Sequence, residues 1–330
     1  MSGPDPICPI CFERFVAGPT HCPHDGAPLG PLGQALLADD PYIGLRVCER
    51  YLLERLQGYG SMGRVYAGRD SETGRADAVK ILHRQLAGDA GVVSRFEREA
   101  RLARSLDHPN IVAIEATARL ADPHGTATRL PVLIMEQIPG ASLRSELVRH
   151  PNGLRLERAV HILEEICEAV QEAHKNGIVH RDLKPANVML FVASGEERVK
   201  VLDFGIAKST REQGSHPTTR GSVLGTPLYI SPEAARGDTV TPASDVYSLA
   251  ILLFECVAGR PPFVSPNPIA VLVQHASHPA PRLDELPDGP QVPRSLADLV
   301  ACNLAKKPGD RMADAGVLLR ALSELSLPQA

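Results

Sequence analysis

The sequence lacks a marked excess of charge of either sign, and it lacks any apolar run long enough to cross a lipid bilayer. Its 330 residues carry 35 lysines and arginines against 39 aspartates and glutamates, a net charge of −4. So small an imbalance argues against electrostatic attraction to nucleic acid or to a membrane, and we predict neither as a partner. The most apolar run, Leu249 to Val257, contains Glu255 and is shorter than the roughly 20 residues of a membrane helix.

The N-terminus also lacks the basic start and apolar stretch of a secretory signal, so we expect a cytoplasmic protein. The seven cysteines fit a reducing compartment, in which clustered thiols bind metal more often than they form disulfides. Four cysteines in apolar or helical surroundings are expected to be buried: Cys48, Cys167, Cys256 and Cys302.

The patterning divides the chain into three zones. Residues 1–28 hold three of the cysteines, and residues 29–50, with little periodic pattern, are predicted to form a linker. From Tyr51, alternating apolar residues punctuated by glycine predict strands joined by turns, with one helix at about residues 91–105. After Gly140 the apolar residues recur at helical spacing. We therefore expect an α+β protein with a small strand-rich part and a larger helical part.

Three glycines follow a G-x-G-x-x-G-x-V pattern, at Gly58, Gly60 and Gly63. Glycine lets backbone N–H groups approach phosphate oxygens closely. The same spacing opens dinucleotide-binding folds, but there a helix follows the glycines, whereas here a strand is predicted. The chain has no Gly-Lys dipeptide, which excludes a Walker-type phosphate loop. A plain glycine-rich hairpin turn remains the alternative.

Further residues suited to binding phosphate or a metal ion follow along the chain. Lys80 lies in an apolar strand and needs a partner or a ligand, and Glu99 on the predicted helix can supply that partner. A merely structural salt bridge is the alternative. Asp182, Asn187 and Asp203 each follow or adjoin an apolar strand, and their oxygen atoms suit Mg²⁺ bound to substrate phosphates. Together these residues favour a metal–phosphate centre.

In order and spacing, His180-Arg181-Asp182-Leu183-Lys184-Pro185-Ala186-Asn187 and Asp203-Phe204-Gly205 resemble the protein-kinase signature set. The chain is most similar to the eukaryotic-type (Hanks-type) serine/threonine kinases of bacteria. The resemblance implies a bilobal protein-kinase fold over residues 51–325. Its small β-rich N-lobe with one main helix would span about residues 51–138, and its larger helical C-lobe about 139–325.

The resemblance also implies roles for single residues. The glycines at 58, 60 and 63 would cover the ATP phosphates, and Lys80 would hold them while paired with Glu99. Asp182 would accept the proton of the substrate hydroxyl, with Lys184 steadying the transferred phosphoryl group. Asn187 and Asp203 would hold Mg²⁺ or Mn²⁺. Lys184 is typical of the serine/threonine kinases, which indicates protein substrates with those acceptors.

The resemblance also implies which residues contact the adenine base. Met135 resembles the gatekeeper, so Glu136 and Ile138 would present backbone groups to the base. The side chains that would sandwich it are Leu56, Val65, Ala78 and Met189.

Family features also mark the remainder of the kinase region. Glu233 of Ser231-Pro232-Glu233 would pair with Arg311, and Asp245 would brace the catalytic loop. Two residues depart from the family pattern: Asp77 stands where an apolar residue is common, and Ser231 replaces alanine. Residues 117–130 and 193–198 are predicted to be enlarged hairpin connections.

Arg181, in this family, clamps a phosphorylated activation loop. Thr218 and Thr219 align with autophosphorylated positions of similar kinases, whereas Thr226 would contact the acceptor site. Autophosphorylation in trans would require a homodimer, which is a family expectation. A flexible loop that is simply rich in hydroxyl groups is the alternative.

The N-terminal cysteines resemble a small zinc ribbon that precedes some bacterial kinase domains. Cys8 and Cys11 stand at C-x-x-C spacing, and Cys22 begins a second turn. The fourth ligand is open between Asp25 and the histidines His24 and His21. A disordered tail is the alternative, but about 28 residues do not form a hydrophobic core unless a metal ion or a disulfide holds them together.

Overall fold

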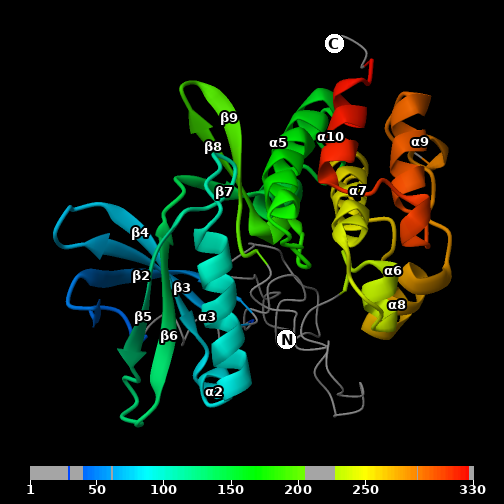
Figure 1. The fold of residues 1–330 in the computed structure, drawn as a ribbon. Helices are drawn as coiled ribbons and strands as arrows, with labels where there is room; N and C mark the ends of the chain where they lie inside the picture. Colours follow the sequence, from blue (N-terminus) through cyan, green and yellow to red (C-terminus); the bar gives the residue numbers. More distant parts are fainter. Residues whose placement is uncertain (1–28, 30–39, 61, 205–226, 288, 327–330) are drawn as a thin grey trace, which may run out of the picture. The chain divides into compact units, whose positions relative to one another are not determined.

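The computed structural model describes residue 29 and residues 40–60, 62–204, 227–287 and 289–326 (Figure 1). They divide into two compact units: the first unit comprises residues up to 107 and residues 112–139, and the second unit comprises residues 108–111 and those from 140 onward. The division after Pro139 falls beside the boundary expected between an N-lobe and a C-lobe. No sequence signal marked the short segment 108–111, which belongs to the second unit.

The first unit is an antiparallel sheet with two helices, and its strands lie in the order β1-β2-β3-β4-β6-β5. Its elements are β1 (Arg46–Val47), β2 (Tyr51–Tyr59), β3 (Gly63–Asp70), β4 (Ala76–Leu82), α2 (Arg84–Ala87), α3 (Ala90–Arg104), β5 (Ile114–Ala121) and β6 (Arg129–Glu136). The predicted helix at 91–105 is confirmed as α3. It begins where the carboxylate of Asp89 accepts hydrogen bonds from the N–H groups of Gly91 and Val92.

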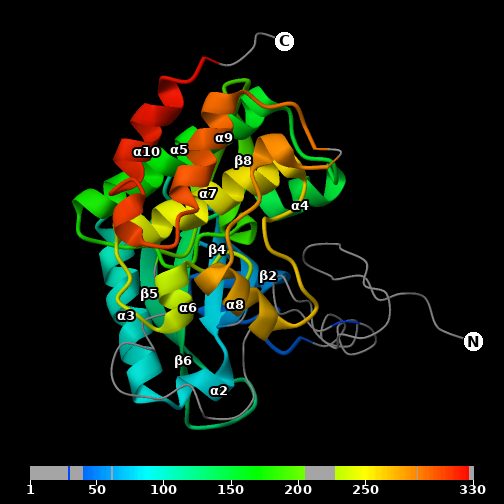
Figure 2. The ribbon, with the colours of Figure 1, turned by 90° about the vertical axis from the view of Figure 1, so that its right-hand side faces the viewer.

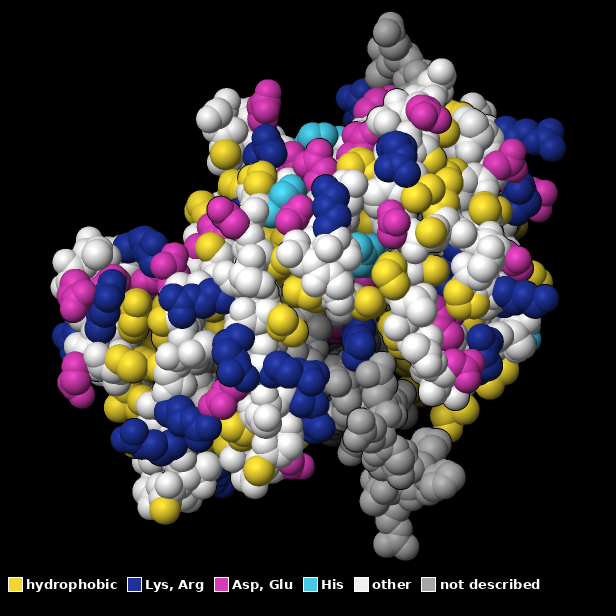
Figure 3. Space-filling view, in the orientation of Figure 1, with side chains coloured by type: hydrophobic (Ala, Val, Ile, Leu, Met, Phe, Trp, Pro, Cys, Tyr) yellow, Lys and Arg dark blue, Asp and Glu magenta, His cyan; other side chains and the backbone are white. Residues whose placement is uncertain are grey.

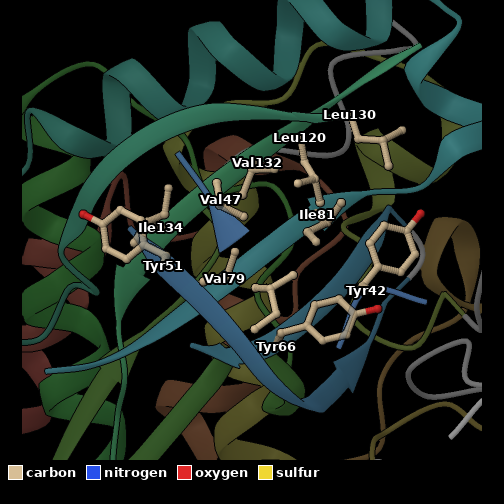
Figure 4. Packing of buried hydrophobic residues seen from close by; sticks show 11 residues of the cluster. Tyr42, Val47, Tyr51, Tyr66, Val79, Ile81, Leu120, Leu130, Val132 and Ile134 are labelled. Atoms are coloured by element: carbon tan, nitrogen blue, oxygen red, sulfur yellow. The ribbon is translucent and has the colours of Figure 1, made fainter. Parts of the chain in front are cut away.

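One face of this sheet carries a hydrophobic core (Figure 4). Strand side chains alternate, so Val79 and Ile81 of β4 join this cluster while Ala78 and Lys80 lie on the other face. Tyr42 and Val47 also belong to the cluster, and both are at most 6% exposed. The predicted linker over residues 29–50 is therefore wrong for residues 40–50. A two-residue strand and a few isolated apolar side chains are too short to produce a periodic pattern.

Two hairpins are tighter than predicted. The pairing of β5 with β6 extends to Ala121 opposite Arg129, so half of residues 117–130 is strand and the connection is limited to residues 122–128. The predicted connection at 193–198 is also wrong, because Ala193 pairs with Glu196 and only Ser194 and Gly195 form the turn. Both turn residues have positive φ, which is the geometry of the tight hairpin turn whose twist matches that of the strands.

The second unit is mainly helical, with a small sheet in the order β7-β8-β9. Its elements are β7 (Gly140–Ser142), α4 (Leu143–Arg149), α5 (Leu156–Lys175), η1 (Pro185–Asn187), β8 (Val188–Ala193), β9 (Glu196–Val201), α6 (Pro232–Arg236), α7 (Pro242–Ala258), α8 (Pro268–Ser277), η3 (Leu283–Glu285), α9 (Arg294–Asn303), η4 (Pro308–Asp310) and α10 (Ala315–Ser323).

Helix α7 forms the centre of the second unit. Residues 243–257 are all buried, and α5, α9 and α10 pack against them (Figure 2). Thr241 caps the start of the helix and Gly259, with φ of +71°, ends it. Among the described residues, no helix combines the length and the apolar character needed to span a bilayer.

Only two of the four cysteines expected to be buried are buried. Cys167 and Cys256 lie inside the second unit, whereas Cys48 and Cys302 are exposed. Cys48 has a positive φ in the turn after β1, and Cys302 lies on the side of α9 opposite its buried residues. Apolar neighbours in the sequence did not distinguish these positions.

Candidate active site

The glycine hairpin joins β2 to β3, and its three glycines differ in what they require. A Cβ at Gly63 would lie 2.2 Å from the carbonyl oxygen of Ile81, so packing within the sheet demands glycine there. At Gly58 and Gly60 a Cβ would find no atom closer than 3.6 Å. Packing against the described residues does not require glycine at these two positions, and glycine leaves the backbone there open to close approach by a ligand.

Lys80 lies at the centre of the sheet, opposite Val65 on β3 and Leu133 on β6. It is 7% exposed, so its ammonium group is largely shielded from water. The predicted pairing with Glu99 falls outside what can be described, because the structure places the backbone of Glu99 in α3 but not its side chain.

The side chains of Asp182, Lys184 and Asn187 converge in the second unit. The Nζ of Lys184 lies 2.9 Å from Oδ2 of Asp182. The Nδ2 of Asn187 donates to the backbone oxygen of Asp182 at 2.8 Å and contacts its Oδ2 at 3.2 Å. Three residues that the sequence analysis assigned to catalysis and metal binding therefore form one hydrogen-bonded group.

The buried carboxylate of Asp245 on α7 fixes the chain just before this group. Its Oδ2 accepts from the N–H of His180 at 2.7 Å and its Oδ1 from the N–H of Arg181 at 2.9 Å. The expected bracing role of Asp245 is confirmed. His174, which no motif singles out, lies 2.9 Å from the same Oδ2 through its Nε2 and accepts the N–H of Ala315 at its Nδ1.

His180 connects this segment to the end of β9. Its Nε2 donates to the carbonyl of Leu202 at 3.0 Å, and its ring lies 4.7 Å from that of Phe204. Burial lowers the pKa of His180, which keeps the imidazole neutral, so its Nδ1 can accept from the N–H of Asp182 at 3.3 Å. The N–H of Leu202 donates to the carbonyl of Asn187, which fixes the chain beside Asp203.

The residues expected around adenine do not all lie on one face. Val65 and Ala78 lie on the same sheet face as Lys80. Leu56 pairs with Tyr66 and packs against the core cluster of the opposite face. The expectation that Leu56 contacts the base is therefore wrong. The register shift between Leu56 and Gly58 changes the alternation of side chains along β2, so Leu56 lies on the core face.

Two of the residues expected beside adenine, Met135 and Glu136, are the last residues of β6, and Ile138 follows the strand. Met135 is 6% exposed and pairs with Ala78 on β4. The N–H of Glu136 donates to the carbonyl of Ala113, and its carboxylate accepts from the N–H of Ala113 at 2.7 Å. Met189 lies on β8 in the second unit, where it is partly exposed.

The expected ion pair between Glu233 and Arg311 is confirmed. Two hydrogen bonds of 2.8 Å join them, and the side chains are 3% and 0% exposed. Ser231, a departure from the family pattern, is the N-cap of α6, because its hydroxyl accepts from the N–H of Ala234. A serine at this position therefore stabilises the start of the helix, which alanine cannot do.

A second buried polar group escaped the sequence analysis. Glu255 accepts the hydroxyl of Tyr229 at 2.6 Å and lies 3.3 Å from Arg144. In the sequence Glu255 is only a charge that interrupts an apolar run. Its two partners stand 26 and 111 residues away, so no local pattern joins them.

Several expectations concern residues that the structure leaves undescribed. These include the proposed zinc ligands at Cys8, Cys11, Cys22 and Asp25, and the activation-loop residues from Gly205 to Thr226. Within the described ranges, no group of three or more histidine, cysteine, aspartate or glutamate side chains is arranged to hold a metal ion.

Comparisons with known proteins agree with this geometry. The chain is 40% identical over 266 residues to the serine/threonine-protein kinase PknB of Mycobacterium tuberculosis, and 38% identical over 282 residues to the probable serine/threonine-protein kinase PknB of Corynebacterium glutamicum. These matches cover 80% and 85% of this chain, but it spans only 41% and 43% of the length of those relatives.

The fold is also that of a known kinase domain. The crystal structure of the Mycobacterium tuberculosis PknI kinase domain is similar, with a TM-score of 0.61 and 26% identity over 85% of this chain and 98% of that one. It confirms the predicted arrangement of a β-sheet N-lobe and a helical C-lobe. Residues 51–321 match the protein kinase domain family. The chain, with its hydrogen-bonded Asp182, Lys184 and Asn187, therefore belongs to the protein kinase domain family.

Proposed function

We propose that the protein is an ATP- and Mg²⁺-dependent serine/threonine protein kinase. The observation that carries this proposal is the hydrogen-bonded group of Asp182, Lys184 and Asn187, braced by Asp245 in a chain of the protein kinase domain family. Phosphoryl transfer asks a protein chiefly for positioning and for neutralisation of charge, and this group is built for both.

In the proposed reaction the hydroxyl oxygen of a substrate serine or threonine forms a bond to the γ-phosphorus of ATP. The bond between that phosphorus and the β–γ bridging oxygen breaks, and ADP leaves with the electron pair. Asp182 accepts the hydroxyl proton, and the ammonium group of Lys184, 2.9 Å from Asp182, is placed to stabilise negative charge on the transferred group.

Asn187 and Asp203 fit the expected magnesium ion. The Nδ2 of Asn187 is engaged by Asp182, so its Oδ1 is the atom presented to a metal, and Asp203 adds carboxylate oxygens. When bound, the ion would neutralise charge on the phosphates. Lys80 and the glycine hairpin would hold those phosphates, with Glu99 as the partner of Lys80.

We also propose how the base is bound. Val65, Ala78 and Met189 would pack against adenine, with Met135 as gatekeeper. The N–H of Glu136 is engaged by Ala113, so Glu136 would present its carbonyl group to the base. Ile138 would present the second backbone contact.

The decisive test is phosphate incorporation by the full chain with ATP and Mg²⁺, mapped by mass spectrometry. We expect phosphoserine or phosphothreonine in the wild type and at least ~100-fold less in Asp182→Asn, because general-base catalysis contributes about 10²–10⁴-fold. The matched control is Asp238→Asn, which loses only an exposed ion pair with Arg236. If the wild type binds nucleotide but incorporates no phosphate, the protein is instead a nucleotide-binding scaffold.

Regulation of the proposed kinase would involve its activation loop. Autophosphorylation in trans at Thr218 or Thr219 would create a phosphate for Arg181 to bind, in a transient homodimer that signals in the cytoplasm. A Thr218→Ala/Thr219→Ala double variant that is fully active from an unphosphorylated preparation would contradict this part of the proposal.

The N-terminal segment is proposed to bind one structural Zn²⁺ through Cys8, Cys11 and Cys22, with Asp25, His24 or His21 as the fourth ligand. Two observations support this proposal: the C-x-x-C spacing, and the fact that so short a segment needs a bound metal ion to fold. Metal analysis after dialysis against a weak chelator tests it. A metal-free protein with fully reactive thiols would show that no zinc site exists.

A further inference from the structure

A small pocket of about 140 Å³ lies in the first unit beside the glycine hairpin. The polar and aromatic side chains that line it come from segments far apart in the sequence: Tyr42, Tyr59, Arg64, His83, Arg84 and His124. Among the residues that the structure describes, two arginines and two histidines line the pocket, and neither an aspartate nor a glutamate does. The carboxylates of Asp40 and Asp122 lie behind the two arginines, at 3.3 and 3.9 Å from their Nη1 atoms.

Arg64 is held rigidly at this pocket. Its guanidinium group lies over the rings of Tyr42 and Tyr59, at 5.5 and 5.3 Å from their centroids. Its Nη1 lies 3.3 Å from the buried carboxylate of Asp40, which also accepts the hydroxyl of Tyr66 at 2.8 Å. A guanidinium fixed in this way loses little conformational entropy when an anion binds.

Arg84 is held less tightly. Its Nη1 is 3.9 Å from Asp122, longer than a hydrogen bond, and its side chain is 48% exposed. A ligand would therefore compete with only one long ion pair for its guanidinium group. Figure 3 shows Lys and Arg side chains over the first unit, and Arg98, Arg101 and Arg104 of α3 are exposed.

We propose that this pocket binds a phosphate monoester. Arginine pairs with phosphate through parallel charge-assisted hydrogen bonds, and the planar rings of Tyr42 and Tyr59 flank the site. The volume is far below the roughly 300–1,000 Å³ of pockets that take a drug-sized molecule, so a whole nucleotide does not fit. One phosphate group with a few attached atoms does, as on a phosphorylated side chain or a small phosphate ester.

The pocket is joined to the glycine hairpin through His83. The N–H of His83 donates to the carbonyl of Met62 at 2.8 Å, and its Nε2 donates to the carbonyl of Gly60 at 2.7 Å. Its ring lies 4.8 Å from the ring of Tyr59, which stands between Gly58 and Gly60. A ligand that contacts His83 and Tyr59 therefore changes how the hairpin is held. This coupling rests on the proposed function, in which the hairpin covers the ATP phosphates.

The test is a calorimetric titration of the full-length Asp182→Asn protein with O-phosphothreonine, with the nucleotide site saturated by a non-hydrolysable ATP analogue and Mg²⁺. We expect binding that weakens at least ~10-fold in Arg84→Gln, the loss of one charge-assisted contact. The matched control is Arg119→Gln, since Arg119 has a similarly exposed side chain and one ion pair but does not line the pocket. Equal affinity in Arg84→Gln and the parent, or an equal loss in Arg119→Gln, overturns the site.

Further experiments identify the kind of molecule that carries the phosphate and test the coupling between the pocket and the glycine hairpin. A peptide of residues 213–224 phosphorylated at Thr218 that binds more tightly than O-phosphothreonine supports a phosphorylated protein segment. Equal affinity supports a free phosphate ester. Saturating phosphothreonine should change the affinity for the ATP analogue in the parent protein and not in Arg84→Gln. Phosphothreonine binding without any such change disproves the coupling alone, and failure of the analogue to bind disproves only the proposed function.

Discussion

At the scale of single residues, two positions of the proposed site have backbone conformations that amino acids other than glycine rarely adopt. Arg181 has φ of +65° and Asp203 has φ of +55°. Such a conformation costs roughly 1–3 kcal/mol and persists only where neighbouring contacts enforce it. The hydrogen bond from the N–H of Arg181 to Asp245 supplies one such contact, and the bond from Leu202 to Asn187 fixes the chain before Asp203. Backbone strain at these two residues, which lie beside the Asp182 group, is expected for a preorganised site.

Asp77 is the residue at which a single substitution is most readily expected to stabilise the fold. Its side chain is 0% exposed, and burial raises its pKa although Arg75, 2.9 Å away, opposes the shift. A valine suits the strand and removes the buried charge. We expect Asp77→Val to raise the free energy of unfolding by about 1–2 kcal/mol at pH 7, since apolar replacements of buried ion pairs are often stabilising.

The pH dependence of this stability difference follows from the raised pKa of Asp77. Because the folded state holds the proton more tightly than the unfolded chain, the ionised carboxylate destabilises the fold as pH rises above about 4. The advantage of valine should therefore shrink below pH 4 in urea unfolding curves. Asp70→Val is the matched control: Asp70 is equally buried, but its two hydrogen bonds to Arg50 lower its pKa, so that variant should be less stable. An Asp77→Val protein less stable than the wild type at pH 7 would refute the argument.

At the scale of elements, the ion pair of Glu233 and Arg311 joins α6 to the segment before α10. Burial by itself would raise the pKa of Glu233, but hydrogen bonds from Arg311 and Ser244 outweigh it and lower that pKa. We expect Glu233→Gln to cost about 3–5 kcal/mol at pH 7, because it leaves the buried charge of Arg311 without its carboxylate partner. Arg236→Gln, which breaks an exposed pair with Asp238, should cost at most about 1 kcal/mol.

The lowered pKa of Glu233 also determines the pH range in which its stabilising contribution is lost. The contribution of Glu233 is complete above its unfolded pKa of about 4.3 and disappears as pH falls through the lower folded value. The difference between wild type and Glu233→Gln should therefore narrow in acid. Chemical unfolding at pH 7 and at pH 3 measures both values, and a gap that stays constant would show that the charge of Glu233 does not stabilise the fold.

Some elements and site residues could be predicted from local sequence patterns, and others could not. Helix α7 could be predicted because Thr241, Gly259 and the apolar run between them are local signals. The signature residues Asp182 and Asn187 could be predicted as well, since the kinase motif fixes their spacing. The extent of β5 and β6 could not, because their pairing is a property of two segments at once.

Other failures come from contacts that no motif records. His174 reaches Asp245 from 71 residues away, and Asp40 meets Tyr66 from a range with no periodic pattern. Leu56 lies on the face opposite to the one that the family resemblance implies, because a register shift between Leu56 and Gly58 changes the alternation of side chains along β2. In each case the information lies in tertiary packing, which the residue order alone does not display.

At the scale of the whole molecule, the compact first unit begins earlier than the matched kinase domain. The family match starts at residue 51, yet Tyr42 and Val47 are buried in the core cluster and Asp40 bonds to Tyr66. Full burial of side chains of this size stabilises a fold by about 1.5–3 kcal/mol each. A chain that starts at Tyr51 should therefore be several kcal/mol less stable than one that starts at Leu29, and it should also lose the pocket wall that Tyr42 forms.

Thermal and urea unfolding of the two truncated chains beside the full protein tests this expectation. The chain that starts at Leu29 lacks the cysteine segment but keeps β1 and the cluster residues, so it serves as the control for removing sequence as such. If both truncated chains unfold at the same urea concentration, residues 40–50 add nothing to the core. If only the shorter chain is destabilised, the first compact unit begins at about residue 40, and residues 1–28 are dispensable for its stability.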